Sequence, residues 1–103
     1  MSYALTRRAE RDIDEILDYI AEQDSLDRAY GVHRRFVEAF ELLARNPRIG
    51  APRNHLTPQA DLRWWVVIGF SVLYRPDPRP LTIMRVLHGA RDIERMVKRR
   101  PSS

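Results

Sequence analysis

Apolar residues at helical spacing mark the first part of the chain. Five of them fall on one stripe of a helix: Ala9, Ile13, Ile16, Leu17 and Ile20. Thr6 precedes this stripe as a candidate N-cap, and the pattern stops near Gln23. Acidic residues fill most of the remaining surface, so the pattern predicts an amphipathic helix with an acidic outer face.

A second stripe follows after a short interruption. Asp24 and Ser25 break the first pattern and can cap a new helix. Its apolar positions repeat every three or four residues: Ala29, Val32, Phe36, Phe40 and Leu43. Asn46 and Pro47 end it, because proline lacks the amide hydrogen that a helix interior needs. Two long helices with a short link predict an antiparallel helical hairpin.

The rest of the apolar residues come in short runs typical of strands. Residues 3–5 can open the fold as a strand, and residues 48–62, with Gly50, predict a loop of about fifteen residues. Residues 64–68, 70–75 and 81–87 are rich in aromatic and β-branched side chains and predict three strands of a meander. Residues 90–100 predict a short closing helix.

The predicted element order is β-α-α-β-β-β-α in a single domain, residues 1–103. It indicates an α+β fold, a small antiparallel sheet packed on the helical hairpin. The strands are apolar on both faces. In the first of these strands we expect Trp64, Val66 and Ile68 to point to one face of the sheet and Trp65 and Val67 to the other. In the last strand we expect Met84 and Val86 on one face and Leu81, Ile83 and Leu87 on the other. The second face should then expose apolar surface, which marks a contact with another chain unless the closing helix or a second copy covers it.

Composition restricts the class of protein. With 103 residues, 44% of them hydrophobic and 31% charged, the chain has the size and balance of one globular domain. The absence of cysteine excludes disulfides and thiolate zinc sites, and the three histidines have no helical spacing, so we expect no metal and no cofactor. The longest apolar run, residues 64–74, is too short to span a bilayer, and no signal peptide is apparent. We therefore expect a cytoplasmic protein.

Charge is divided unevenly along the chain. Residues 1–46 hold seven Arg against ten acidic residues, whereas residues 47–103 hold eleven cations against four. Lys98 is the one lysine among eighteen cations, and arginine pairs bidentately with carboxylate or phosphate. The basic half predicts an acidic partner, either nucleic acid or an acidic protein segment. The alternative is a surface that is merely well solvated.

Several motifs together resemble the RelE/ParE superfamily of bacterial toxins. The likeness runs in order over residues 3–97 and is closest to ParE-type toxins of ParDE toxin-antitoxin modules, which act in plasmid stabilisation. It is carried by residues 4–6, residues 9–12, Asn-Pro-Arg-Ile-Gly at 46–50 with Pro52 and Arg53, residues 72–75, and Arg-Val-Leu-His-Gly-Ala-Arg-Asp-Ile at 85–93. The resemblance implies the same helical hairpin and sheet.

The resemblance also implies a function. ParE-type toxins inhibit DNA gyrase and are neutralised by a cognate antitoxin, whereas RelE-type toxins enter the ribosome and cleave messenger RNA. RNA cleavage needs a base, an acid and cations for the phosphorane. RelE-type ribonucleases carry a basic patch on the central strands, and residues 64–69 contain no cation. We therefore expect a non-catalytic gyrase inhibitor. The alternatives are a RelE-type ribonuclease or an inactive member that only binds antitoxin.

The ribonuclease alternative would use His88, Arg85, Arg91 and Tyr74. Each has a structural explanation as well. His88 can be a turn histidine, and Arg85 can pair with a carboxylate from the helical layer. Arg91 can form a local ion pair, and Tyr74 can be a half-buried strand tyrosine. For Arg85 we favour the pairing over a position on the open face. His55, in the loop, receives no role.

The resemblance further implies a partner surface. We expect an acidic, partly disordered C-terminal segment of the antitoxin to wrap the hairpin and the sheet in a hetero-oligomer, with DNA contacted only through the antitoxin. The expected antitoxin-binding residues are Trp64, Trp65, Arg75, Arg85, Phe36 and Phe40. The expected target-binding residues are Arg63, Arg91 and Arg95. Trp64 and Trp65 could instead stack on bases, and the loop that follows residue 48 could touch a target or be a solvated connection.

Overall fold

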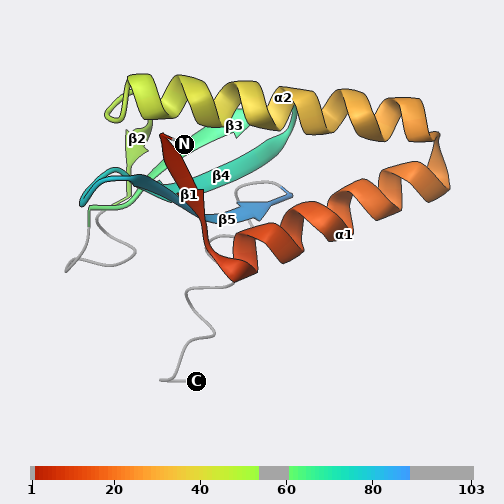
Figure 1. The fold of residues 1–103 in the computed structure, drawn as a ribbon, viewed down its shortest axis with the longest axis horizontal. Helices are drawn as coiled ribbons and strands as arrows, with labels where there is room; N and C mark the ends of the chain where they lie inside the picture. The colour runs from red at the N-terminus through yellow and green to blue at the C-terminus, as the bar shows by residue number, and fades with distance from the viewer. Residues whose placement is uncertain (1, 54–60, 89–103) are drawn as a thin grey trace.

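A computed structural model describes residues 2–53 and 61–88 as two helices and a five-stranded sheet (Figure 1). The elements in chain order are β1 (Tyr3–Leu5), α1 (Arg7–Gln23), α2 (Leu26–Arg45), β2 (Ala51–Pro52), β3 (Arg63–Val67), β4 (Phe70–Arg75) and β5 (Leu81–Leu87). The α+β fold and this order confirm the sequence prediction. The predicted closing helix and His55 lie outside the described residues.

The sheet has the strand order β1-β5-β4-β3-β2. The three predicted strands β3, β4 and β5 pair antiparallel, as expected, and β2 adds a further antiparallel strand beside β3. β1 instead pairs parallel to β5, with Tyr3 opposite Leu81, so the sheet is mixed. β2 lies within the predicted loop and pairs with Arg63 and Trp64. Two residues, one of them a proline, are too few to give a strand pattern in the sequence.

Each helix begins at a hydroxyl cap. The Thr6 hydroxyl accepts a hydrogen bond from the Ala9 amide at 3.0 Å and donates one to the Met84 carbonyl at 2.9 Å. Ser25 accepts from the Arg28 amide at 3.0 Å. Both caps fall where the sequence predicts helix starts. Thr6 also links the start of α1 to β5, a contact that only the folded chain reveals.

The core lies between the helical hairpin and the sheet (Figure 1). The helices contribute buried side chains at the predicted stripe positions: Ala9, Ile13, Val32, Phe36, Phe40 and Leu43. The strands contribute Val67, Val72, Tyr74, Leu81, Ile83 and Val86. Because these side chains leave water together, the two layers stabilise one another.

A β-bulge in β5 changes which strand residues face the core. Leu73 pairs with Arg85 but the next residue, Tyr74, pairs with Ile83, so Met84 has no opposite partner. As a result Ile83 and Val86 are both buried in the same core, at 0% and 1% exposure. The predicted alternation, which placed Val86 opposite Ile83, is wrong here because one extra residue reverses it.

Among the described residues, three of the large exposed apolar side chains lie near β3 and three lie on the helices. Val66 in β3 is 58% exposed, Ile68 in the following turn 40% and Ile49 before β2 43%. Leu73 and Ser71, in β4, are buried. The expected uncovered surface is therefore present, but it is concentrated at the β3 edge and its turn. Among the described residues, no helix is long and apolar enough to cross a membrane.

Candidate functional site

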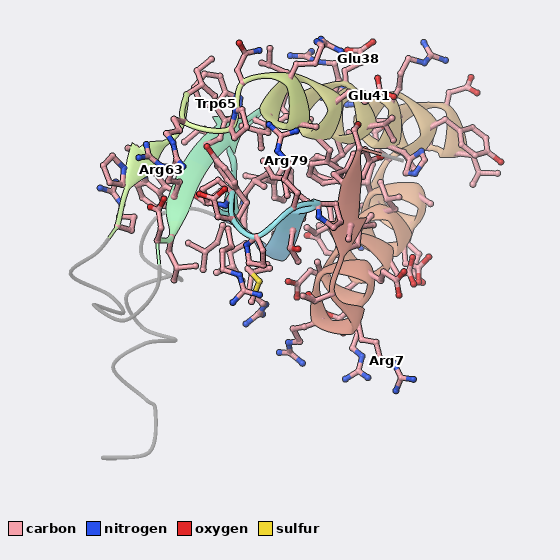
Figure 2. All side chains as sticks on the ribbon, turned by 60° about the vertical axis from the view of Figure 1, so that its left-hand side comes forward. Arg7, Glu38, Glu41, Arg63, Trp65 and Arg79 are labelled. Atoms are coloured by element: carbon pink, nitrogen blue, oxygen red, sulfur yellow. The ribbon has the colours of Figure 1, made fainter. Side chains whose placement is uncertain are left out.

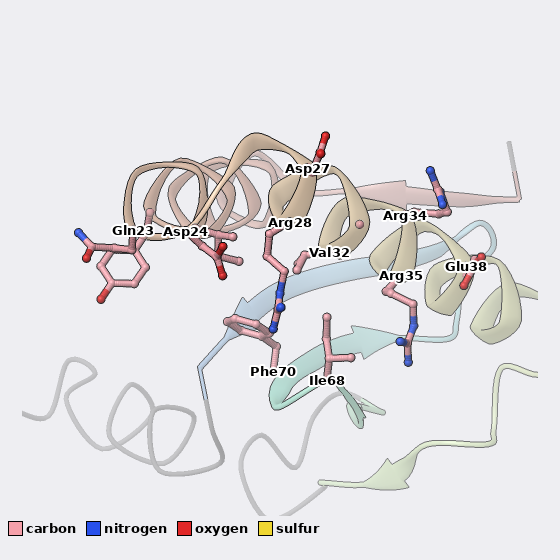
Figure 3. A pocket seen from close by; sticks show the side chains of 13 residues that line it. Gln23, Asp24, Asp27, Arg28, Val32, Arg34, Arg35, Glu38, Ile68 and Phe70 are labelled. Atoms are coloured by element: carbon pink, nitrogen blue, oxygen red, sulfur yellow. The ribbon is translucent and has the colours of Figure 1, made fainter.

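A groove of about 820 Å³ lies between α2, the C-terminal end of α1 and the turn that joins β3 to β4 (Figure 3). We call it the α2 groove. Its apolar side chains include Ile20 and Val32 from the helices and Ile68 and Phe70 from the strand side. Phe70 is fixed by an edge contact with Phe36, with ring centroids 5.5 Å apart. A partner side chain placed here would meet an ordered apolar surface.

The charges around the α2 groove are arranged unevenly. Arg28 and Arg35 extend from α2 toward the strands, on either side of Ile68, whereas Asp27 and Arg34 point away from the strands (Figure 3). Within residues 2–53 and 61–88, none of the salt bridges involves these four residues. Asp24 and Glu38 also line the groove, so its lining holds three arginines and three acidic residues.

Ile68 occupies an unfavourable backbone conformation. Its φ is 42° and that of Gly69 is 86°, the pair of left-handed values that a two-residue type I′ hairpin turn requires. Asn-Gly is the favoured sequence for this turn, and a β-branched side chain with positive φ is strained. Ile68 is also 40% exposed. The turn thus presents an apolar side chain to solvent at a cost in stability.

A second hollow, of about 420 Å³, adjoins the first between α1 and the ends of β4 and β5. The two share Tyr19, Ile20 and Phe70 as lining residues, so the apolar surface is continuous. His88 lines this hollow, with its ring 5.1 Å from that of Phe70. Arg8 lines the hollow from the first turn of α1.

Arg85, predicted for two different sites, is bound to α1. Its Nε and Nη2 donate to the Asp12 carboxylate at 2.7 and 3.1 Å. The Asp12 Oδ2 atom also accepts from the Val86 amide at 3.0 Å. The predicted pairing of Arg85 with a carboxylate from the helical layer is confirmed.

Tyr74 is fully buried and forms a clamp on the chain before β2. Its hydroxyl donates to the Pro47 carbonyl at 2.8 Å and accepts from the Gly50 amide at 2.9 Å. Burial raises the pKa of Tyr74, although the Gly50 hydrogen bond and the charge of Arg63 oppose the shift. A Cβ at Gly50 would lie 2.5 Å from the Tyr74 hydroxyl, so this position has room only for glycine.

The candidate ribonuclease residues do not come together in the described part of the chain. Tyr74 pairs with Ile83, while His88 follows Leu87, which pairs with Ser71 at the other end of β4. Tyr74 and His88 therefore lie toward opposite ends of the β4 and β5 pair. Arg85 is bound to Asp12, and Arg91 is outside the described residues.

Arg63, a predicted target-binding residue, points inward. It lies beside β2 (Figure 2), and its Nη1 donates to the carbonyls of Arg48 and Gly50 at 3.1 and 2.9 Å. Its side chain is 17% exposed and also approaches Asp61 at 3.5 Å. Arg63 therefore positions this loop. A target contact through Arg63 stays a prediction that the geometry does not support, and Arg91 and Arg95 lie outside the described residues.

Arg48, at the start of the same loop, is bound to the end of that loop and to the segment between β4 and β5. Its guanidinium bonds Asp61 at 2.9 Å and Asp77 at 2.6 Å. The Asp77 hydrogen bond and charge, followed by those of Asp61, raise the pKa of Arg48 further. These two ion pairs therefore fix the conformation of the loop around Arg48.

The predicted antitoxin-binding residues divide between surface and core. Trp64 is partly buried beneath the Arg53 guanidinium, which lies 3.9 Å from the ring centroid. It lines a hollow of about 440 Å³ with Ile49, Ala51, Trp65 and Val66. Trp65 packs partly against the core, and Arg75 is partly buried. Phe36 and Phe40 are core residues at 0% and 2% exposure, so their role in partner binding stays a prediction without an accessible surface.

The sequence prediction missed three residues of the α2 groove. Arg28 and Arg35 are seven residues apart, which places them on one side of a helix, and that spacing could have identified them. Ile68 precedes Gly69 where a tight hairpin favours asparagine, which was a second available signal. In the described residues, no three His, Asp or Glu side chains gather as metal ligands would.

The chain is similar in sequence and in fold to known bacterial proteins. Residues 3–93 match the family model for the ParE toxin of the type II toxin-antitoxin system parDE. The chain is 33% identical over 86 residues to Toxin ParE1 of Caulobacter vibrioides, covering 84% of this chain and 86% of that protein. Toxin ParE3 of the same organism is 31% identical over 84 residues, covering 82% of each. A solved structure of the chromosomal ParDE system from P. aeruginosa superposes with a TM-score of 0.72 at 25% identity, covering 86% of this chain and 96% of that one.

Proposed function

Because the chain belongs to the ParE family of toxins of type II toxin-antitoxin systems, we propose that it arrests bacterial growth by binding DNA gyrase and that a cognate antitoxin holds it inactive. The observation that carries this proposal is the family match over residues 3–93, which includes the hairpin and the whole of the described sheet. In this proposal the toxin acts by binding and forms a hetero-oligomer with its antitoxin in the cytoplasm.

The geometry favours inhibition by binding over RNA cleavage. General acid-base cleavage needs its groups within hydrogen-bond reach of one phosphodiester. Tyr74 is buried and uses its hydroxyl in two structural hydrogen bonds, and Arg85 is paired with Asp12. His88 therefore lacks these two proposed partners. We retain Arg91 and Arg95 as proposed target contacts on the basis of the sequence.

The proposed antitoxin surface is the α2 groove and the β3 edge. Both expose apolar side chains, Ile68 in one and Val66 in the other. At the edge Arg53 lies over Trp64, and in the groove Arg28 and Arg35 extend toward the strands, although three acidic residues also line the groove. An acidic segment with apolar side chains matches this combination, since it can bury the apolar surface while its carboxylates meet the arginines.

The test is to induce the chain alone in a bacterial host and to follow the DNA damage response and messenger integrity in the same cells. We expect arrest with filamentation, a DNA damage response and intact messages, and inhibition of purified gyrase by the purified chain. His88→Ala should arrest growth as the unmodified chain does. Messages cut at ribosomes, with arrest lost in His88→Ala, would establish the ribonuclease instead. Unimpaired growth would indicate an inactive member.

A further inference from the structure

We propose that a hollow between β1 and the helical hairpin is the docking surface for the toxin's target, and that it receives an arginine side chain from a basic segment of that target. This inference rests on the proposed function, because it takes the target protein as the occupant. It adds the face of the toxin that meets the target, the chemistry of the segment recognised and the side chains that select it.

The hollow has a volume of about 350 Å³ and lies between β1, α1 and α2, at the edge of the sheet that β1 forms (Figure 1). We call it the β1 hollow. The ring of Tyr3 packs edge-on against that of Phe40, with centroids 5.5 Å apart, and Phe36 and Phe40 are core residues. Core packing therefore fixes the wall before a partner binds, which lowers the entropy cost of binding. The apolar lining residues are Tyr3, Leu5, Ile13, Phe36, Val37 and Phe40.

The charged side chains that line the β1 hollow are acidic. Glu10 and Asp14 lie four residues apart on one side of α1, and neither belongs to a salt bridge of the described residues. The described lining contains no arginine or lysine, whereas three arginines line the α2 groove. Burial raises the pKa of Tyr3, and the negative charge of Glu41 raises it further. This face of a chain with a net charge of +4 is thus locally negative and attracts a cation.

A guanidinium group suits the β1 hollow better than an ammonium group. Its planar face can stack on the ring of Tyr3, and its fork of donors can serve the carboxylates of Glu10 and Asp14. The methylene groups of the same arginine can pack against Leu5 and Val37, which line the hollow beside the charged residues. One side chain therefore satisfies both the apolar and the acidic part of the lining.

Two exposed apolar side chains extend this surface along α2. Leu26 and Tyr30 are 62% and 65% exposed. They precede His33 and Val37, which line the hollow, at intervals of four, three and four residues, so all four lie on one side of the helix. Tyrosine is among the residues that contribute most to binding at protein interfaces. The target segment therefore runs along α2 from the β1 hollow toward the turn between the helices.

The charge of the β1 hollow selects the target over two other occupants. The antitoxin segment expected from the sequence is acidic, so Glu10 and Asp14 repel it. A second copy of this chain would have to place a different, basic face against the hollow. A head-to-tail contact of this kind builds rings or filaments and not a closed dimer. A basic segment of the target meets neither difficulty.

Charge reversal tests the hollow against a matched control. Asp14→Lys and Asp18→Lys make the same chemical change one turn apart on α1, but Asp18 lines neither the β1 hollow nor the α2 groove. With the full chain and purified DNA gyrase, we expect the dissociation constant to rise about tenfold or more for Asp14→Lys. For Asp18→Lys we expect less than about a threefold change. Glu10→Lys should repeat the effect of Asp14→Lys, and thermal unfolding confirms that each variant is folded.

Two tyrosines provide a comparison that does not depend on charge. Tyr30 and Tyr19 are 65% and 64% exposed, but Tyr19 lines the α2 groove, which shares no lining residue with the β1 hollow. Tyr30→Ala should weaken gyrase binding about tenfold and change antitoxin binding less than about threefold. Tyr19→Ala should leave gyrase binding within about threefold of the unmodified chain. Both side chains are exposed, so neither substitution removes core packing.

The outcomes separate this inference from the proposed function. Equal gyrase binding by Asp14→Lys and Asp18→Lys, or equal losses in Tyr30→Ala and Tyr19→Ala, would overturn the β1 hollow while leaving gyrase inhibition intact. Weaker antitoxin binding by Asp14→Lys, with gyrase binding unchanged, would assign the hollow to the antitoxin. Self-association of the chain that Asp14→Lys abolishes in sedimentation would assign it to a second copy. If the unmodified chain does not bind gyrase, the proposed function fails together with this inference.

Discussion

Asp12 of α1 binds Arg85 of β5 through two hydrogen bonds, of 2.7 and 3.1 Å, and both side chains are largely withdrawn from solvent. The same carboxylate accepts from the Val86 amide. β1 covers this side of β5 only as far as Ile83, so Asp12 provides the hydrogen-bond acceptor that a neighbouring strand would otherwise supply. The first half of α1 is thus fixed to the edge of the sheet.

Asp12→Ala should destabilise the fold strongly. It leaves the Arg85 guanidinium and the Val86 amide without their carboxylate, and breaking a largely buried ion pair costs about 3 kcal/mol. Urea unfolding followed by circular dichroism measures this cost. Asp14→Ala, on the exposed face of the same helix, is the control and should change the free energy of unfolding by less than about 0.5 kcal/mol. Equal effects of the two substitutions would contradict the role given to Asp12.

Two glycine substitutions should act in opposite directions. Gly50→Ala places a Cβ 2.5 Å from the Tyr74 hydroxyl and 2.7 Å from the Trp64 carbonyl, so we expect a loss of about 2 kcal/mol or more. Gly31 lies within α2 with no atom within 4 Å of such a Cβ. Gly31→Ala should therefore raise the free energy of unfolding by about 0.5 to 1 kcal/mol, as helix propensity dictates. Thermal unfolding of both variants measures these changes. A Gly50→Ala protein as stable as the unmodified chain would contradict the close contact between Tyr74 and Gly50.

Tyr74→Phe should cost about 1 to 2 kcal/mol near neutral pH. The Gly50 amide and the Pro47 carbonyl both lose their partner in a buried site. The difference from the unmodified chain should then shrink in alkali. The folded state raises the pKa of Tyr74 above its unfolded value of 10.0, so the contribution of Tyr74 is complete below pH 10 and is lost as the pH rises through the folded pKa. Unfolding curves of both proteins from pH 7 to 11.5 measure this, and a difference that grows with pH would contradict it.

The two helix caps should differ in strength. Thr6→Ala removes the cap of α1 together with the hydrogen bond to the Met84 carbonyl, and we expect a loss of about 2 kcal/mol. Ser25→Ala removes an exposed cap alone and should cost about 1 kcal/mol. Chemical denaturation of the two variants compares them directly. Equal losses would mean that the bond to β5 contributes nothing.

The sequence by itself determined the helices, the three longer strands and their order. The stripes through Ile13 and Phe36 repeat with the helical period, and Thr6 and Ser25 cap the helices through neighbours three residues away. These signals depend on residues close in the chain, so they are readable without a structure. The family motifs at residues 46–50 and 85–93 added the toxin class, which the comparisons support.

Only the tertiary structure decided the register of β5 and the residues of the α2 groove. The bulge at Met84 depends on how β4 and β5 pair, and the sequence period alone does not reveal one unpaired residue. The parallel pairing of β1 joins segments almost eighty residues apart. Arg28 and Ile68 come together because α2 packs over the β3 and β4 turn. Each of these segments could pair with many distant parts of the chain. Packing and backbone hydrogen bonding in the complete fold determine which of these contacts form.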